Sequence, residues 1–315
     1  MSNLTFVVPT YNSANFLRDT VASVYDGNFC DGDELILVDD CSTDGTIELI
    51  EQLKTEFNGI RLFQHKVNRG RGIAGVNTAV ENAGNDLIFV LDHDNILAPG
   101  SIPQLKAFLL KNQYDAAAFR EVRFFKDGSK CDDTVQVWQY KENEVTLSDV
   151  FAGYIWPGPD GNYMFTRESW IKAGRCNEFI NAAIDCWAFG IRQLATGARM
   201  GILNDSFYYH RFGHESQFNT NVAKRSLSLS ALEVLLPFID LFDEHEVEYL
   251  FGRESRYTWL ERLSDRPIKL KGMSLGTDGR HIHRVKRMQY FEDIVQKLTP
   301  PILYHKMKSI IQQKK

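Results

Sequence analysis

The segment DLIFVLDHDN, which runs from Asp86 to Asn95, decides the fold. Its apolar residues from Leu87 to Leu91 predict a buried strand. Asp92 and Asp94 follow directly, and carboxylates gather at the end of a buried strand when a positive partner neutralises them. Mg²⁺ or Mn²⁺ is the natural partner, since both ions bind carboxylate and phosphate oxygens. Two acids on their own also suit an ordinary turn or helix cap, but their position after the strand favours a cation that bridges Asp94 to a diphosphate.

Short β-branched runs alternate with helical patterns over about the first 120 residues, which is typical of βαβ units and a parallel sheet. In such a sheet, ligands bind at the carboxyl ends of the strands. The expected strands are Leu4–Val8, Glu34–Val38, Ile60–Gln64, Asp86–Leu91 and Asp115–Phe125. The polar segments expected to converge at one edge are PTYN (9–12), DDCSTDG (39–45), HKVNRGRG (65–72) and DHDN (92–95).

Helices are expected where apolar residues recur on one face. One such face comprises Leu49, Ile50, Leu53 and Phe57, and Asp44 is well placed to cap that helix. From Lys126 to Gly161 the pattern weakens, and the run YIWPGPDG (154–161) predicts a loop region able to move. The elements expected after it are a helix from Ile184 to Thr196, a short strand from Arg199 to Leu203, the segment YYHRFGHESQF (208–218) and helical structure beyond Asn221.

Composition excludes several classes of protein. The chain has 315 residues, a net charge of −5 and a pI near 5.9, so it is not a general nucleic-acid binder. Its 5 cysteines are scattered without CxxC spacing, which argues against a disulfide framework or a zinc site and suits a reducing cytosol. No signal peptide is expected, because Met1 leads almost at once into a strand-like segment, and no apolar run approaches the roughly 20 residues that span a bilayer.

Four segments occur in an order and spacing that resemble one known family. They are VVPTYNSANFLRDTVASV, ELILVDDCSTDGT, the stretch from Asn68-Arg69-Gly70 to Asn77, and VLDHDNILAPGSI. From about residue 4 to 215, the chain resembles the family 2 inverting glycosyltransferases, which have the GT-A fold. The resemblance implies an α/β nucleotide-diphospho-sugar transferase fold with a mostly parallel central sheet flanked by helices, followed here by a C-terminal helical extension.

The resemblance also implies roles for individual residues. Pro9, Thr10 and Tyr11 would lie against the nucleobase. Asp39 and Asp40 would hydrogen-bond the base and ribose, and Arg71 and Asp92 would reach the nucleotide. A plain structural alternative is that Asp39 and Asp40 only cap the next helix.

The remaining implied roles concern the metal and the proton. Asp94 would bind Mn²⁺ or Mg²⁺, and a downstream histidine would complete the site, with His210 preferred over His214. Asp185 would be the general base, and its place in the first turn of the expected helix favours the ionised carboxylate. These roles match what a single displacement needs: neutralisation of the departing diphosphate and a base for the attacking hydroxyl.

Several of these residues have plainer alternatives. The family pattern has a second acid just before the base, and Ile184 stands there instead, which leaves Glu178 as a competitor for the role of base. Asp185 could be an ordinary capping acid, and His210 a structural histidine. Trp156, in the Gly/Pro-rich loop, could stack on an acceptor sugar or simply pack.

The expected organisation is a catalytic domain over residues 1–221 and a helical, basic extension over residues 222–315. Residues 1–125 would form the nucleotide-sugar half and residues 126–221 the acceptor half. The last 50 residues carry 12 Lys and Arg against 3 Asp and Glu, so they could lie on an anionic membrane surface or form a solvated cap.

The expected function is therefore transfer of a sugar from a UDP-sugar or a related nucleotide-sugar to a saccharide or lipid-linked acceptor, in the cytoplasm or at the cytoplasmic face of the membrane. The alternative is a non-catalytic subunit of the same fold that binds a nucleotide-sugar or a glycan. A dehydrogenase is excluded by the turn after the first strand, which carries PTYNSAN in place of GxGxxG.

Overall fold

The structure is a computed structural model, and its contacts divide the chain into two compact units. The first unit comprises Met1–Val150 and Ile155–Asn221, and the second comprises Phe151–Tyr154 and Val222–Lys315. The residues that the structure describes are 2–126, 135–137, 143–147, 162–179, 185–214, 233–241, 268–270 and 273–275. Trp156 and most of the expected loop region lie outside them.

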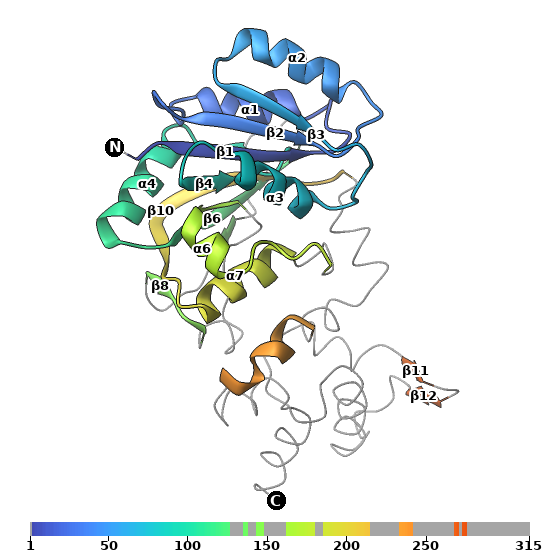
Figure 1. Cartoon of the computed structure of the whole chain (residues 1–315), viewed down its shortest axis with the longest axis vertical. Coiled ribbons are helices and arrows are strands. Elements are labelled where there is room, and N and C mark those ends of the chain that lie inside the picture. The colour runs from blue at the N-terminus through green and yellow to red at the C-terminus, as the bar shows by residue number, and fades with distance from the viewer. Residues whose placement is uncertain are drawn as a thin grey trace, which may run out of the picture. The chain divides into compact units, whose positions relative to one another are not determined.

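The nucleotide half of the first unit is built on four parallel strands in the order β3-β2-β1-β4 (Figure 1). Their bounds are β1 (Leu4–Thr10), β2 (Glu34–Asp39), β3 (Ile60–Gln64) and β4 (Leu87–Val90). Every residue of β1 and β4 is buried, as expected for parallel strands covered on both faces. The first four predicted strands are therefore confirmed, with ends that shift by at most two residues.

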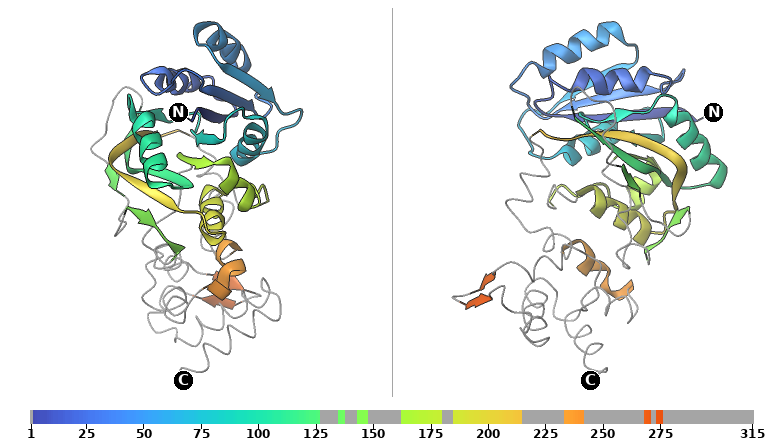
Figure 2. Two further views of the ribbon diagram at one scale, coloured as in Figure 1. Left: turned by 60° about the vertical axis from the view of Figure 1, so that its left-hand side comes forward. Right: turned by 180° about the vertical axis from the view of Figure 1, so that it is seen from behind.

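Three helices connect these strands and cover the two faces of the sheet (Figures 1 and 2). They are α1 (Leu17–Tyr25), α2 (Thr46–Glu56) and α3 (Gly72–Asn82). The N-cap of α2 is Gly45 rather than Asp44, but the Asp44 carboxylate accepts from the Thr46 N–H at 3.0 Å and so still satisfies a free amide of the first turn. Helix α3 packs closely on β1, because a Cβ at Gly75 would lie only 2.9 Å from the Cβ of Pro9.

The same sheet continues beyond β4 in the order β4-β9-β6-β10-β5. Strand β9 (Tyr163–Thr166) is antiparallel to both β4 and β6 (Ala116–Phe125), and β6 is parallel to β10 (Met200–Arg211). The edge strand β5 (Ile96–Leu97) is antiparallel to β10. Two short strands, β7 (Val135–Val137) and β8 (Glu144–Val145), pair with β6 and β10 respectively.

The predicted strand Arg199–Leu203 was too short. The register between β10 and β6 shifts between Leu203 and Phe207, and Asp205 has a positive φ of 54°. This irregularity interrupts the apolar pattern, and the strand then resumes and runs on to Arg211. Residues 208–211 of the aromatic, histidine-containing segment are thus part of a long strand.

Three further helices complete the described part of the first unit: α4 (Ser101–Asn112), α6 (Arg167–Lys172) and α7 (Asp185–Ala195). Helix α7 confirms the helix expected from Ile184 to Thr196 and buries Trp187, Ile191 and Leu194. None of the helices within the described ranges has the length and apolarity needed to cross a bilayer.

In the second unit, the described elements are a short 3₁₀ helix η2 (Leu236–Leu241) and an antiparallel pair, β11 (Ile268–Leu270) and β12 (Met273–Leu275). The rest of the expected helical, basic extension lies outside the described residues.

Candidate functional site

Asp39 ends β2 and is engaged by the turn that follows it. Its Oδ2 accepts from the Ser42 N–H at 2.9 Å, and its Oδ1 accepts from the Ser42 hydroxyl and, at 3.4 Å, from the Thr10 hydroxyl. Between them Cys41 adopts a positive φ of 67°. The carboxylate is 1% exposed, so it stabilises the turn that shapes the end of the strand.

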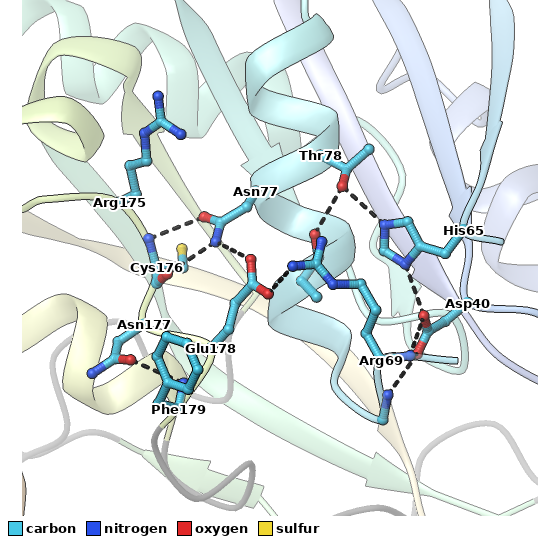
Figure 3. A network of polar contacts seen from close by, with 12 residues as sticks. Asp40, His65, Arg69, Asn77, Thr78, Arg175, Cys176, Asn177, Glu178 and Phe179 are labelled. Atoms are coloured by element: carbon cyan, nitrogen blue, oxygen red, sulfur yellow. Dashed lines mark hydrogen bonds and ion pairs between the residues drawn. The ribbon is translucent and has the colours of Figure 1, made fainter. Parts of the chain in front are cut away.

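Asp40 holds the loop that leads into α3 (Figure 3). Its carboxylate accepts from the backbone N–H of Arg69 at 2.9 and 3.0 Å and from that of Gly70 at 2.9 Å. Its Oδ1 also lies 2.7 Å from Nδ1 of His65, whose Nε2 lies 2.9 Å from the Thr78 hydroxyl. Asp40 therefore joins the ends of β2 and β3 to the start of α3.

Asp92 is oriented by two fully buried asparagines. The Asn162 side chain accepts from the Asp92 N–H at 2.8 Å and donates to its Oδ2 at 3.1 Å. Asn95 donates to the same oxygen at 3.3 Å. Both asparagines are 0% exposed, so amide dipoles fix the carboxylate direction. Asn162 was missed by the sequence analysis, because it lies 70 residues from its partner.

Asp94 contacts His214 rather than His210. The His214 Nε2 lies 2.9 Å from Oδ2 of Asp94, whereas the His210 ring packs edge-on against Phe124 with centroids 5.2 Å apart. The reason is the chain direction: His210 is still inside β10, and the turn at Gly213, with a φ of 88°, brings His214 back toward the acid. His214 is thus the histidine hydrogen-bonded to Asp94, and the choice of His210 as the metal ligand stays a prediction.

The pKa of Asp94 reflects this setting. Burial alone would raise the pKa of the carboxyl, but the hydrogen bond with His214 and the nearby His93 and His210 outweigh burial and lower the pKa to about 2. The group is therefore a permanent carboxylate, which is the form that binds a cation. Within the described ranges no group of three or more His, Cys, Asp or Glu side chains that could hold a metal ion is found.

Arg211, the last residue of β10, binds the turn that contains Asp94 and Asn95. Its Nε donates to the Asp94 carbonyl at 3.1 Å, and its backbone N–H donates to the Asn95 side chain at 3.2 Å. The guanidinium is 5.1 Å from the centre of the Phe16 ring and 4.7 Å from that of Phe125. This residue also went unrecognised, although a buried arginine directly after a histidine-containing strand could have suggested it.

Asp185 is the first residue of α7 and is 8% exposed. Burial raises its pKa to about 6, against the opposing effect of hydrogen bonds from the Cys186 thiol and N–H and of the Arg71 charge. The position at the helix start favours the ionised form, but desolvation outweighs it and raises the pKa. At neutral pH the carboxylate is still mostly ionised, and it is more basic than an exposed aspartate.

Arg71 brings the loop before α3 close to Asp185. It is the N-cap residue of α3, and its charge acts on the Asp185 carboxyl. Its Nη1 is buried and has no hydrogen-bond partner among the described residues, as is also true of Nε and Nη2 of Arg192. Buried guanidinium nitrogens without partners are costly unless an anion binds them.

Glu178, the sequence competitor for the role of base, has both carboxylate oxygens engaged (Figure 3). Oε1 accepts from Nδ2 of Asn77 at 2.9 Å, and Oε2 forms an ion pair with Arg69. Both Glu178 oxygens are thus held by other side chains, and the assignment of Asp185 as the base stays a prediction.

The residues expected at the nucleobase lie at the carboxyl end of β1. Pro9 and Thr10 are the last residues of β1, and the Thr10 hydroxyl donates to the Val38 carbonyl at 3.3 Å. Tyr11, the next residue, is 37% exposed. Because β2 and β4 both pair in parallel with β1, Asp40 and the Asp92–Asp94 turn leave the same edge of the sheet.

Comparisons with known proteins agree with this geometry. The sequence model described as Glycosyl transferase family 2 matches residues 5–172. The chain is 27% identical over 116 residues to a poly(ribitol-phosphate) beta-N-acetylglucosaminyltransferase, TarS, of Staphylococcus aureus, which is 36% of this chain and 20% of that protein. It is 35% identical over 149 residues to a putative teichuronic acid biosynthesis glycosyltransferase, TuaG, of Bacillus subtilis, which is 47% of this chain and 58% of that protein. These matches thus span less than two thirds of either relative.

Solved structures match over almost the whole chain. S. aureus TarS 1-349 in complex with UDP aligns with a TM-score of 0.64 at 17% identity, over 98% of this chain and 87% of that one. A mannosyltransferase from Pyrobaculum calidifontis in complex with GDP-Man and Mn²⁺ aligns with a TM-score of 0.58 at 14% identity, over 99% and 86% of the two chains. At these identities the likeness establishes the fold.

Proposed function

Since the chain belongs to glycosyl transferase family 2 and has the GT-A fold, we propose that it transfers a sugar from a nucleotide-diphosphate sugar, specifically a UDP-sugar, to a hydroxyl of a saccharide or lipid-linked acceptor with inversion. The proposal is supported most directly by Asp185, a buried carboxylate whose pKa is raised to about 6 beside the charge of Arg71. The attacking hydroxyl needs a base that takes its proton. The departing diphosphate needs a positive charge that stabilises it, which Arg71 would supply.

The nucleotide would lie along the carboxyl edge of β1 and β2. Pro9, Thr10 and Tyr11 would contact the base, and Asp39 and Asp40 would shape the edge that receives the base and ribose. The unpartnered Nη1 of Arg71 would bind a diphosphate oxygen, which would satisfy that buried donor. TarS in complex with UDP and with UDP-GlcNAc supports a uridine nucleotide.

A divalent cation would be held by Asp94 and His214. The donor set fits, because a carboxylate and an imidazole 2.9 Å apart leave the other positions of Mn²⁺ or Mg²⁺ to diphosphate and water oxygens. Arg211 holds the backbone of the same turn through the Asp94 carbonyl. When bound, the ion supplies neutralisation of the diphosphate charge.

Asp185 would act as general base in a single displacement. The acceptor oxygen forms its bond to the anomeric carbon as the bond from that carbon to the diphosphate oxygen breaks, and Asp185 takes the hydroxyl proton. Attack from the face opposite the leaving group inverts the configuration. A positioned base of this kind contributes about 10² to 10⁴ in rate.

Thermal unfolding with a panel of nucleoside diphosphates and nucleotide-sugars, with Mn²⁺ or Mg²⁺, tests the proposal. A true donor at about 100 times its dissociation constant adds about 2.7 kcal/mol of stability, and Asp94→Ala removes the metal-dependent part. Absence of stabilisation by any nucleotide with either metal would contradict donor binding. Stabilisation without turnover on any acceptor would instead favour the non-catalytic alternative.

A further inference from the structure

The segment from Cys176 to Glu178 is fastened to α3 by one side chain, Asn77. Its Nδ2 donates to the Cys176 carbonyl and to Oε1 of Glu178, both at 2.9 Å. Its Oδ1 accepts from the Cys176 N–H at 3.0 Å and from the Trp170 indole N–H at 3.2 Å. Asn77 is 8% exposed, so all donors and acceptors of a buried amide are used to hold a segment about 100 residues further along the chain.

The second carboxylate oxygen of Glu178 extends this network to the nucleotide side. It pairs with Nη2 of Arg69, and the Arg69 backbone N–H in turn binds the Asp40 carboxylate. Figure 3 shows the contacts in series, from His65 and Asp40 through Arg69 and Glu178 to Asn77. The loop that carries Arg71 and the segment that leads to Asp185 are therefore joined by a side-chain ion pair.

The Arg69–Glu178 ion pair contributes little to folding. The two side chains are 42% and 22% exposed, and exposed pairs are worth about 0–1 kcal/mol. The buried amide of Asn77 holds the segment without it. What the pair adds is a fixed relation between the loop that leads to Arg71 and the segment from Cys176 to Glu178.

We propose that Arg69 and Glu178 are positioning residues that set where helix α7 presents Asp185 relative to the nucleotide. The proposal rests on the function proposed for Asp185. Glu178 precedes Asp185 by 7 residues, and Arg69 precedes Arg71, whose charge acts on the Asp185 carboxyl. A displacement of about 1 Å in a reacting group can cost about 10²-fold in rate, so a link of small free energy can still govern turnover.

The test uses the full chain with four variants that alter the ion pair: two single removals, their combination and one replacement that keeps the charge. Arg69→Met and Glu178→Gln each remove it, and Glu178→Gln keeps an oxygen for Asn77. Each is expected to lower kcat about 10- to 100-fold while the KM for the donor changes less than about threefold. The double variant is expected to be no slower than either single variant, because one link is lost in all three. Arg69→Lys, which keeps the charge, is expected to recover most of the rate.

The control is a second ion pair, which joins α3 to the residue directly before Cys176. Arg175 forms an ion pair with Glu81 of α3, and their side chains are 59% and 44% exposed. Glu81→Gln therefore removes a more exposed ion pair that does not reach the Asp40 loop, and it is expected to leave kcat unchanged. A loss of rate in Glu81→Gln equal to that in Glu178→Gln, or additive losses in the double variant, would overturn the proposal.

Hydrogen exchange separates this proposal from the proposed function. In Arg69→Met, the amides of residues 176–179 and of the first turn of α7 are expected to exchange about two- to fivefold faster than in the wild type, whether or not the chain transfers a sugar. Unchanged exchange in a variant with normal thermal stability would reject the link. Failure of the wild type to bind any nucleotide would instead reject the proposed function and leave the exchange result as the test of the link.

Discussion

At the residue scale, Asp185 combines a stability cost with a chemical use. Its pKa in the folded chain is about 6, above the ordinary value of 3.8, so folding disfavours the charged form. The free energy of unfolding is therefore reduced at pH values above about 6, and this penalty disappears as the pH falls below about 4, where the acid is neutral in both states.

Asp185→Asn is accordingly expected to stabilise the protein while slowing transfer about 10²- to 10⁴-fold. At about 1.4 kcal/mol per pKa unit, the gain in free energy of unfolding at pH 7.5 is roughly 3 kcal/mol at most. Urea unfolding at pH 7.5 and pH 4 measures it, and the gain should be absent at pH 4. Nucleotide binding is expected to remain. Normal turnover by this variant would show that another group is the base.

The pH dependence of the wild-type rate follows from the same group. A base with a pKa near 6 is mostly protonated below that pH and cannot accept the hydroxyl proton. The rate constant kcat is therefore expected to fall about tenfold per pH unit below 6 and to level off above 7. Initial rates from pH 5 to 8 at saturating donor provide the measurement. The weak residual rate of Asp185→Asn should show no such limb.

The two histidines near Asp94 are expected to differ sharply. His214→Ala removes the imidazole 2.9 Å from the carboxylate, whereas His210→Ala removes a ring that packs on Phe124. Calorimetric titration with Mn²⁺ and UDP should show affinity about tenfold or more weaker in His214→Ala. A smaller change is expected in His210→Ala. The reverse order would restore His210 as the ligand.

Short motifs were sufficient to predict the acids but not the groups that orient them. Asp40, Asp94 and Asp185 each lie in a segment with a local pattern, namely a strand end or a helix start. Asn162 and Arg211 act on the 92–95 turn from other strands, and their roles depend on pairings that only the folded sheet creates. The acids' proposed roles in catalysis stay predictions.

At the element scale, the contact between α3 and β1 sets how closely the Arg71 loop approaches the sheet. A Cβ at Gly75 would meet the Pro9 Cβ at 2.9 Å and the Val38 Cβ at 3.5 Å. Gly75→Ala is expected to lower the free energy of unfolding by about 1–2 kcal/mol, because overpacking against a rigid proline outweighs the helix propensity of alanine, worth up to about 1 kcal/mol.

Gly72→Ala is the matched control for this substitution. It lies in the same helix, and its Cβ would meet Pro9 at an ordinary 3.7 Å. Urea unfolding should place this variant within about 0.5 kcal/mol of the wild type. Equal stability of the two alanine variants would show that α3 can move away from β1 without cost.

Element positions were largely predictable because parallel strands buried on both faces form continuous apolar runs. Prediction failed where the pattern breaks within an element. The irregularity between Leu203 and Phe207 divides β10 into two short apolar runs, and a single chain gives no sign that both pair with β6.

At the scale of the whole molecule, every residue proposed to bind nucleotide or metal lies within residues 1–221. A chain truncated after Asn221 is therefore expected to bind UDP with Mn²⁺ within about threefold of the full chain, as measured by calorimetry. The affinity is expected to be retained because the last strand of the described sheet, β10, ends at Arg211, before the truncation point. A folded truncated chain that binds no UDP would place part of the donor site beyond Asn221.

The order of strands has a mechanical consequence. Strands β4 and β5 are separated by β9, β6 and β10 in the sheet, yet only residues 91–95 connect Val90 to Ile96. That connection can reach about 20 Å when fully extended, and it contains a turn in which the Asn95 N–H donates to the Asp92 carbonyl at 3.1 Å. The sheet must curl to bring its far edge back, and the short tether prevents the two halves from swinging apart. Any separation of β4 from β5 is therefore limited to the distance that residues 91–95 can span.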